Sequence, residues 1–276
     1  MAKTMAAADR LSRTLDEWQH WDLPAPLTHP PLLGPLLAQG SGHAIYEILC
    51  TPPLIGRIRH QSTRLAETAF GTELTAWKAA ALQGIAPGVV FCDPAEQAII
   101  CQRVAPLDAP VSGRALGQLC RRIHQLPALS DKLTLRSDIG LYLEKLPDHL
   151  SRAWRSVMRA GGVEDAMTRL EQDTPCLCHN DLTAGNLMRE GNELVAIDWE
   201  YAAMGSRYFD VAIAAECLSS AERVLMVNEV FGAAADEALM NAGDCIASLI
   251  TALWEHQYAT ASAPDPSTWL NGRGGA

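Results

Sequence analysis

Three polar side chains within one short stretch have the chemistry that phosphoryl transfer requires. Asp181 and Asn186 lie in a polar segment after the apolar residues 176–178, and Asp198 directly follows the apolar run 194–197. Magnesium prefers one or two carboxylates together with phosphate oxygens and water. Phosphoryl transfer needs this metal and an acceptor for the proton of the attacking hydroxyl. We therefore predict that the three side chains converge at one edge of a small hairpin built from the two apolar runs.

An Asx-rich turn between two strands is the alternative explanation for such residues, because a single Asp or Asn most often serves a turn. That explanation leaves the full pattern unaccounted for. The pattern is H-x-D at residues 179–181, then four intervening residues, then Asn186, and then an apolar strand that ends in Asp198. The combination favours a catalytic segment over a turn.

The elements that must hold this segment fall into two groups along the chain. The first group consists of a helix over 6–20, an extended proline-rich connection over 24–35, strands over 44–50, 54–59, 88–92 and 97–104, and a helix over 72–83. The second group consists of helices over 115–124, 139–160 and 166–171, and mainly helical sequence from 209 to a frayed tail that begins at 263. We predict an α+β fold with a small antiparallel-sheet N-lobe (1–104), a larger mainly helical C-lobe (105–276) and an active site in the cleft between them.

Composition restricts the partners and the location that we expect. The chain has 276 residues and a formal net charge of −10, which disfavours nucleic acid and anionic membranes as partners. Its first residues lack a signal-peptide pattern and its apolar runs are too short to span a bilayer, so a cytoplasmic protein is expected. Among eight cysteines, Cys176 and Cys178 form the one closely spaced pair. Because no second pair accompanies them, no zinc framework is predicted and the thiols are expected to pack as small apolar groups.

The sequences HNDLTAGNL (179–187) and AIDWEY (196–201) resemble the catalytic and metal-binding segments of the choline/ethanolamine kinase family, within the aminoglycoside phosphotransferase superfamily. The resemblance extends from about residue 34 to 258. It implies a protein-kinase-like two-lobed fold and a small-molecule kinase that uses ATP and Mg²⁺. It also implies that Asp181 is the catalytic base, that His179 orients the loop, and that Asn186 and Asp198 are magnesium ligands.

The same resemblance assigns residues of the N-lobe to the nucleotide. Gly40 and Gly42 stand where the family has its nucleotide-covering loop, and glycine lets backbone N–H groups approach phosphates. The strand over 54–59 takes the place of the one that carries the nucleotide-binding cation. Arg57 is the closer match to the family's L-x-R-I pattern, but Arg59 points to the same face and remains an alternative. Glu73 is expected to hold this cation.

The resemblance also suggests the phosphoryl acceptor. The run from Tyr201 to Asp210 follows the choline-kinase form, and the L-W-x-x-Q segment at Trp254 resembles the family's cation pocket. With Glu216, these residues suggest a pocket for choline or ethanolamine, because aromatic faces and a carboxylate bind ammonium groups. His124 and Asp210 are expected to be structural.

Alternatives to this acceptor stay open. They are a thiamine kinase, an aminoglycoside or sugar kinase, and a non-catalytic kinase-like binding protein. The last is disfavoured because the proposed base and both metal ligands are present. The acceptor is the least constrained of these expectations, since Thr251 stands where eukaryotic choline kinases have a second tryptophan.

Overall fold

The structure is a computed structural model that describes residues 2–40, 42–60, 67–258 and 260–273. The chain divides into two compact units. Unit 1 contains Met1–Pro110 and Asn186–Tyr201, and unit 2 contains Val111–Gly185 and Ala202–Ala276. The segment that carries Asn186 and Asp198 therefore packs with the N-terminal part of the chain, whereas the division made from the sequence placed it in the C-lobe.

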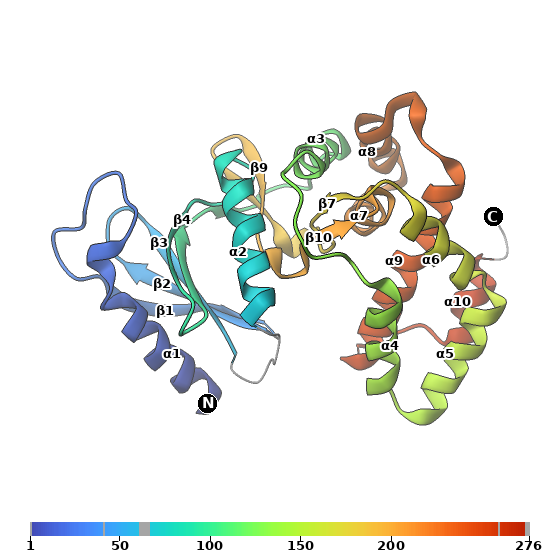
Figure 1. The fold of residues 1–276 in the computed structure, drawn as a ribbon, viewed down its shortest axis with the longest axis horizontal. Helices are drawn as coiled ribbons and strands as arrows, with labels where there is room; N and C mark the ends of the chain where they lie inside the picture. The colour runs from blue at the N-terminus through green and yellow to red at the C-terminus, as the bar shows by residue number, and fades with distance from the viewer. Residues whose placement is uncertain (1, 41, 61–66, 259, 274–276) are drawn as a thin grey trace. The chain divides into compact units, whose positions relative to one another are not determined.

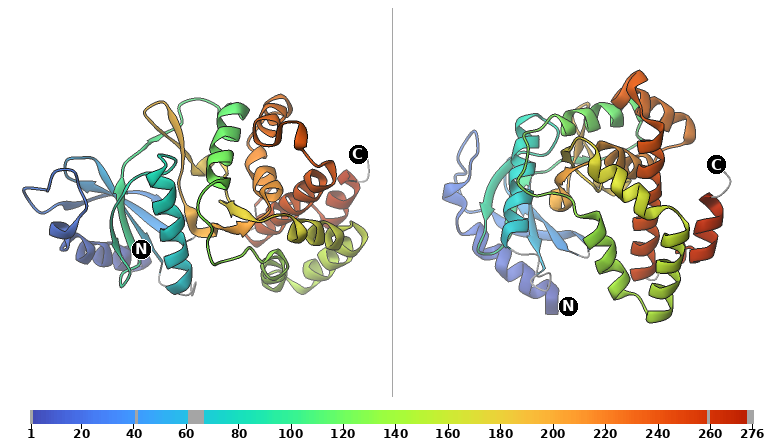
Figure 2. Two further views of the ribbon diagram at one scale, coloured as in Figure 1. Left: turned by 45° about the horizontal axis from the view of Figure 1, so that its top comes forward. Right: turned by 45° about the vertical axis from the view of Figure 1, so that its right-hand side comes forward.

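Unit 1 is built on a five-stranded antiparallel sheet in the order β1-β2-β3-β5-β4. The strands are β1 (Leu32–Gln39), β2 (His43–Leu49), β3 (Leu54–Arg59), β4 (Val89–Asp93) and β5 (Ala98–Gln102). Two helices accompany the sheet, α1 (Ala2–Leu15) and α2 (Glu67–Leu82). Figures 1 and 2 show α1 and α2 on opposite faces of this sheet.

The alternation of side chains along β3 gives the two faces different chemistry. Successive strand residues point to opposite faces. Gly56 faces α1, where an added Cβ would lie 2.8 Å from Leu11. Arg57 and Arg59 face α2, where the Arg57 guanidinium lies over the ring of Trp77. The face under α1 is therefore part of the apolar core, and the face under α2 carries the charged groups of the candidate site.

Strand β1 was not predicted, because its residues overlap the connection expected over 24–35. Pro35 lies inside this strand, next to irregularities in the register between Leu33 and Ala38. Proline cannot donate a ladder hydrogen bond, but an edge strand tolerates it. Since β1 is paired with β2 and forms the edge of the sheet, the strand accommodates Pro35 without losing its pairing.

The predicted hairpin around the catalytic segment is wrong. In unit 2, β7 (Cys176–Cys178) pairs with β10 (Ala203–Gly205). In unit 1, β9 (Glu193–Ala196) pairs with β8 (Leu187–Glu190), which also pairs with β6 (Ala105–Pro106). Gly191, with φ of +59°, lets the chain reverse between β8 and β9. The two expected strands, β7 and β9, therefore do not pair with each other, because each is hydrogen-bonded to a different strand.

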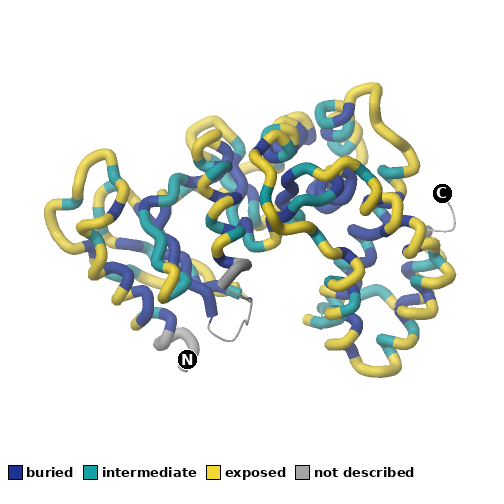
Figure 3. The backbone as a smooth tube through the Cα atoms, in the orientation of Figure 1, coloured by how far each residue is buried: buried dark blue, intermediate teal, exposed yellow. Residues whose placement is uncertain are grey.

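Unit 2 is mainly helical. Its helices are α3 (Gly113–His124), α4 (Leu135–Lys145), α5 (Asp148–Ala160), α6 (Val163–Gln172), α7 (Arg207–Ala215), α8 (Ser220–Phe231), α9 (Glu237–Gln257) and α10 (Pro266–Arg273). Short 3₁₀ turns occur in both units, at Trp18–His20 and Trp199–Tyr201 in unit 1, at Gly232–Ala234 in unit 2, and at Ala184–Asn186 where the two units meet in the sequence. All residues of α7 from Tyr208 onward are buried, as the dark blue tube in Figure 3 shows. A helix that is buried on nearly all sides belongs inside a core, and α7 packs against α9, α3 and β7 of this unit.

The C-terminal tail corrects another expectation. Residues 266–273 form α10 instead of a frayed end, and the ring of Trp269 packs edge-on against Trp154 of α5, with ring centroids 5.6 Å apart. An aromatic anchor of this kind holds a short terminal helix that its own length would not stabilise. Among the described residues, none of the helices has the length and apolar character that crossing a membrane requires.

Candidate active site

Arg57 is the centre of a buried ion-pair network in unit 1. Its guanidinium forms ion pairs with Glu73 of α2 and with Asp198, which follows β9. The Glu73 side chain is fully buried, and that of Arg57 is 5% exposed. Burial alone would lower the pKa of Arg57, but the carboxylates of Glu73, Asp198 and Glu200 raise it above its ordinary value. Arg57 therefore stays charged although it is buried.

Arg59 also forms an ion pair with the Glu73 carboxylate. Its Nη2 lies 3.0 Å from Glu73 Oε2, an ion pair whose angles fall outside hydrogen-bond geometry, and 3.7 Å from Glu200 Oε2. Its backbone carbonyl accepts a hydrogen bond of 2.7 Å from Arg10. Glu73 is thus shared between two arginines, and Arg57 is the one that is paired with Asp198.

His43 lies between the two arginines and was missed by the sequence reasoning. Its Nε2 lies 3.1 Å from Arg59 Nε, and its Nδ1 lies 3.1 Å from Arg57 Nη2. Burial and the positive charges of both arginines lower the pKa of His43. A neutral imidazole accepts at one nitrogen only, so His43 accepts from one arginine and contacts the other. Its place directly after the glycine pair, opposite Arg59 in the sheet, was the available signal.

The turn after β9 presents two carboxylates side by side. Trp199 is fully buried and its Nε1 donates to the carbonyl of Ala196 at 3.2 Å, which fixes the turn. Asp198 adopts a positive φ of 63°, unusual for a residue with a side chain and frequent at functional sites. Burial and the charge of Asp198 raise the pKa of Glu200 to about 7, although Arg57 opposes this. Glu200 was not predicted, although it is part of the I-D-W-E sequence.

Two further predicted residues of unit 1, Asn186 and Gly42, lie close to these carboxylates. The Ile197 N–H donates to the Asn186 carbonyl at 3.0 Å, which brings Asn186 next to the residue before Asp198. In the glycine loop, a Cβ added to Gly42 would lie 3.4 Å from Glu200 Oε2. The Gly40 N–H donates to the His43 carbonyl at 2.9 Å. Ser41, between the two glycines, lies outside the described residues.

Hard ligands for a metal are gathered at the same place. Among the described residues, His43, Asp198 and Glu200 offer ligand atoms that all lie within 4.8 Å of one another. Two carboxylates with a neighbouring amide residue match the oxygen ligands that magnesium prefers. The carboxylates of Asp198 and Glu200 therefore fit the magnesium ion that the sequence predicts, while Asn186 is placed beside them through its backbone carbonyl.

Asp181 lies in unit 2, where a hydrogen bond to Asp210 holds the backbone of the preceding residue. Asn180 has a φ of +63°, and its N–H donates to Asp210 Oδ1 at 2.7 Å. Asp210 Oδ2 lies 2.8 Å from Nε2 of His124. Burial alone would raise the pKa of Asp210, but the hydrogen bonds and charge of these neighbours lower it. His179 is fully buried, and Asp181 itself is half-buried. Asp210 thus holds the backbone immediately before the predicted base.

The predicted acceptor residues divide between the units. In unit 2, the hydroxyl of Thr251 donates to both carboxylate oxygens of Glu216, at 3.0 and 3.1 Å. Trp254 lies in the last turn of α9, and Tyr258 is the residue directly after this helix. Their ring centroids are 4.8 Å apart, and the two residues are 43% and 46% exposed. Tyr201 belongs to unit 1. Tyr258 was missed, although it lies four residues after Trp254, the spacing of neighbours on a helix face.

Comparison with known proteins identifies the family. Residues 65–244 match the family described as the phosphotransferase enzyme family. A segment of 99 residues is 26% identical to the protein LicA homolog of Mycoplasma capricolum, and covers 36% of this chain and 41% of that protein. The chain therefore matches about two fifths of the length of this relative.

Solved structures agree on the fold. A choline/ethanolamine kinase family protein from Mesorhizobium loti is 21% identical, with a TM-score of 0.64 over 96% of this chain and 92% of that chain. Choline kinase LicA from Streptococcus pneumoniae is 15% identical, with a TM-score of 0.70 over 89% and 94% of the two chains. The ADP-bound aminoglycoside phosphotransferase APH(2'')-Ib is also 15% identical, with a TM-score of 0.61 over 95% and 96%. The predicted two-lobed, kinase-like α+β fold is confirmed, and the chain belongs to the phosphotransferase enzyme family.

Proposed function

We propose that this protein is an ATP-dependent small-molecule kinase that phosphorylates the hydroxyl group of a cationic amino alcohol, choline or ethanolamine first. The observation that carries the proposal is the buried Arg57, paired at once with Glu73 and Asp198. Kinases use a strand cation fixed by a helix glutamate, together with a metal-binding aspartate, to hold the phosphates of ATP. The family match supports the same chemistry.

The residues of unit 1 are suited to the nucleotide and its metal. Asp198 and Asn186, with Glu200 beside them, would hold magnesium, which would offset negative charge on the phosphates when bound. The positive charge of Arg57 would attract the phosphate oxygens, and Glu73 would keep its side chain in place. The backbone N–H groups near Gly40 and Gly42 are candidates for further contacts with the phosphates.

Asp181 is the proposed base of the reaction. The half-buried carboxylate would accept the proton of the acceptor hydroxyl as that oxygen bonds to the γ-phosphorus, while the bond from this phosphorus to the bridging oxygen breaks and ADP leaves. The hydrogen bond between the Asn180 N–H and Asp210 holds the backbone on the N-terminal side of Asp181. His179, buried next to it in the chain, would help to orient this segment.

The proposed acceptor is a cation because unit 2 combines aromatic rings with a carboxylate. Trp254 and Tyr258 expose a pair of ring faces, and Glu216 is held by Thr251 one turn before Trp254. Aromatic faces attract an ammonium group by about 0.5–2 kcal/mol per contact, depending on desolvation. The sequence also predicts Tyr201 as an acceptor residue, and Tyr201 belongs to unit 1. A choline kinase and an ethanolamine kinase among the structures of the same fold accord with this assignment.

An acceptor screen tests the proposal. ATP consumption would be measured with magnesium and, in separate reactions, choline, ethanolamine, thiamine, an amino sugar and an aminoglycoside. We expect turnover with choline or ethanolamine to exceed the ATP hydrolysis seen without acceptor. Turnover with thiamine or an aminoglycoside alone would keep the kinase assignment and replace the acceptor. Absence of magnesium-dependent ATP binding would contradict the kinase assignment itself.

A further inference from the structure

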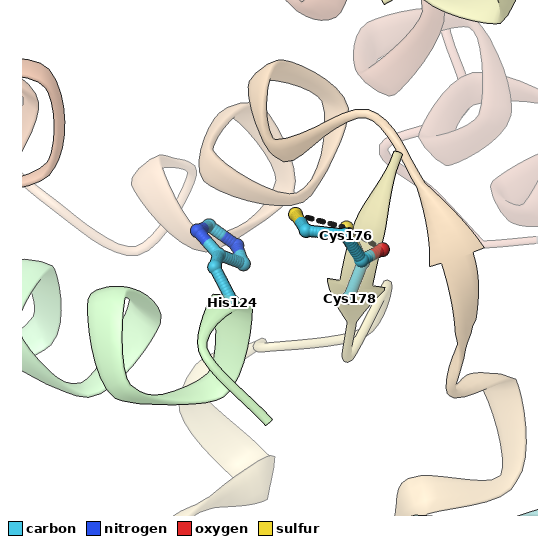
Figure 4. Close-up of side chains that lie close together, drawn as sticks. All are labelled: His124, Cys176 and Cys178. Atoms are coloured by element: carbon cyan, nitrogen blue, oxygen red, sulfur yellow. Dashed lines mark hydrogen bonds between the residues drawn. The ribbon is translucent and has the colours of Figure 1, made fainter. Parts of the chain in front are cut away.

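A second group of metal-ligating side chains lies in unit 2, whereas the groups assigned to magnesium belong to unit 1. It consists of His124, Cys176 and Cys178. One ligand atom from each lies within 4.8 Å of the other two. Figure 4 shows the Cys176 thiol pointing from its strand toward the His124 ring, with the Cys178 thiol beside it. The sequence predicted no zinc framework because it offered no second cysteine pair, but the fold supplies a histidine instead.

The strand geometry accounts for the pairing of the two thiols. Residues i and i+2 of a β-strand point to the same face, so the C-x-C spacing in β7 places both thiols together. Leu177 between them is fully buried on the other face. His124 is the last residue of α3, and its side chain is 8% exposed. Cys178 is buried, whereas Cys176 is half-buried and so is partly exposed to solvent.

The distance between the sulfur atoms fits a tetrahedral metal. The Cys176 and Cys178 Sγ atoms lie 3.8 Å apart. Two thiolates that each bind zinc at about 2.3 Å with a tetrahedral angle also lie about 3.8 Å apart. Thiolate and imidazole are the ligands that zinc takes in proteins, and they are poor ligands for magnesium.

Electrostatics favour a cation at this position. The carboxylate of Asp210 lies 2.8 Å from His124 Nε2, so it fixes the ring and adds negative charge beside the group. Metal-binding histidines commonly have such a carboxylate partner.

We propose that Cys176, Cys178 and His124 bind one zinc ion per chain, with a fourth position left for water or another small ligand. The site would join the end of α3 to β7. Because Cys178 directly precedes His179 and Asp210 binds the Asn180 N–H, the ion would stabilise the strand that leads to Asp181. This proposal is independent of kinase activity and of the identity of the acceptor.

Metal titration of the purified full-length protein tests the site. The protein would be reduced and treated with a chelator, and zinc would then be titrated against a chromophoric chelator. Cobalt would be titrated separately, and its absorption spectrum recorded. We expect one zinc per chain, and a cobalt spectrum with tetrahedral bands and thiolate charge-transfer bands.

Single variants identify the ligands. Cys176→Ser and His124→Asn should each weaken zinc binding by at least about tenfold, because each removes one of three protein ligands. Cys92→Ser is the matched control, since Cys92 is also a half-buried free thiol, and it should bind zinc as the wild type does. Zinc should raise the melting temperature of the wild type and of Cys92→Ser, but not that of Cys176→Ser.

Three results would overturn the proposal. They are equal zinc affinity of the wild type and Cys176→Ser, loss of binding in Cys92→Ser, and a cobalt spectrum without thiolate bands. Circular dichroism of each metal-free variant would show that it is folded before titration. If His124→Asn does not fold, Cys176→Ser decides the question alone, because it alters a single half-buried atom.

Discussion

The two arginines of β3 show what residue-level geometry adds to a sequence pattern. The sequence predicted a cation in this strand and a carboxylate at Glu73, but it could not choose between Arg57 and Arg59, which point to the same face. In the structure both contact Glu73, and Arg57 alone of the two is paired with Asp198. We therefore retain the prediction that Arg57 binds the phosphates, and propose that Arg59 helps to hold Glu73 in place.

Lysine substitutions separate the two roles. Arg57→Lys keeps the charge but loses the fork that contacts Glu73 and Asp198 together. A charge-assisted hydrogen bond contributes about 1.5–3 kcal/mol, so we expect the ATP KM to rise about tenfold or more. Arg59→Lys should change the ATP KM by less than about threefold. Both constants would be measured at saturating acceptor, and a larger effect of Arg59→Lys would reverse the assignment.

Glu216 predicts how acceptor use depends on pH. Although Glu216 is exposed, the protein atoms that crowd its carboxylate raise its pKa, and the hydrogen bond from Thr251 opposes this only in part. A cationic acceptor favours the ionised carboxylate, which predominates above this raised pKa. The kcat/KM for the acceptor should therefore rise with pH through a value above about 4.3, the ordinary pKa of glutamate.

The control for this pH dependence is Glu216→Gln, which cannot ionise. Its kcat/KM for the acceptor should lack the rise assigned to Glu216, while its ATP KM stays within about twofold of the wild type. An unchanged pH profile in Glu216→Gln would remove Glu216 from the acceptor pocket.

Several residues of the site were missed in the sequence for a common reason. Asp181, Asn186 and Asp198 are close in sequence, so their spacing alone indicated chemistry. His43 and Glu200 are far apart in the chain, and their relation to the arginines exists only after the sheet and α2 have formed. The same holds for His124, which reaches the C-x-C pair through the packing of α3 on β7.

At the scale of elements, the spacing of apolar residues predicted the helices but did not predict which strands pair. The helices of unit 2 were expected close to where they occur, because amphipathic spacing is a local property. Pairing of β7 with β10 and of β8 with β9 depends on which segments meet, and apolar runs of three or four residues do not specify this. Strand β1 was missed because Pro35 indicates a connection unless the strand is known to be an edge.

Close packing of α9 on α7 gives a prediction for stability. A Cβ added to Gly243 would lie 2.5 Å from the backbone oxygen of Tyr208, an approach that requires the helices to move. Gly243→Ala should therefore destabilise the protein by about 1–3 kcal/mol. Gly140→Ala in α4 is the matched control, because nothing lies within 4 Å of its added Cβ.

Urea unfolding of both variants would measure the difference. Gly140→Ala should be neutral or more stable than the wild type by up to about 1 kcal/mol, since alanine favours helix over glycine. If Gly243→Ala were as stable as Gly140→Ala, the contact between α9 and α7 would be looser than the structure describes.

At the scale of the whole molecule, the net charge of −10 acts on any charged acceptor. An acidic protein raises the local concentration of cations, and dissolved salt screens this attraction over about 10 Å at 0.1 M. The kcat/KM for choline should therefore fall as potassium chloride is added. The neutral analogue 3,3-dimethylbutanol has a similar shape, so its smaller kcat/KM should depend much less on salt. Equal salt dependence for the two acceptors would show that the acceptor is not recognised as a cation.

The central claim is that this chain transfers the γ-phosphate of ATP to a small hydroxyl acceptor with Asp181 as base. The most direct test is a single-turnover reaction with ATP radiolabelled at the γ-phosphate, magnesium and choline, in the wild type and in Asp181→Asn. We predict labelled phosphocholine from the wild type, and a rate at least about a hundredfold lower in Asp181→Asn, with ATP binding unchanged. Transfer by Asp181→Asn at the wild-type rate, or no labelled product from any acceptor of the screen with the wild type, would contradict this account.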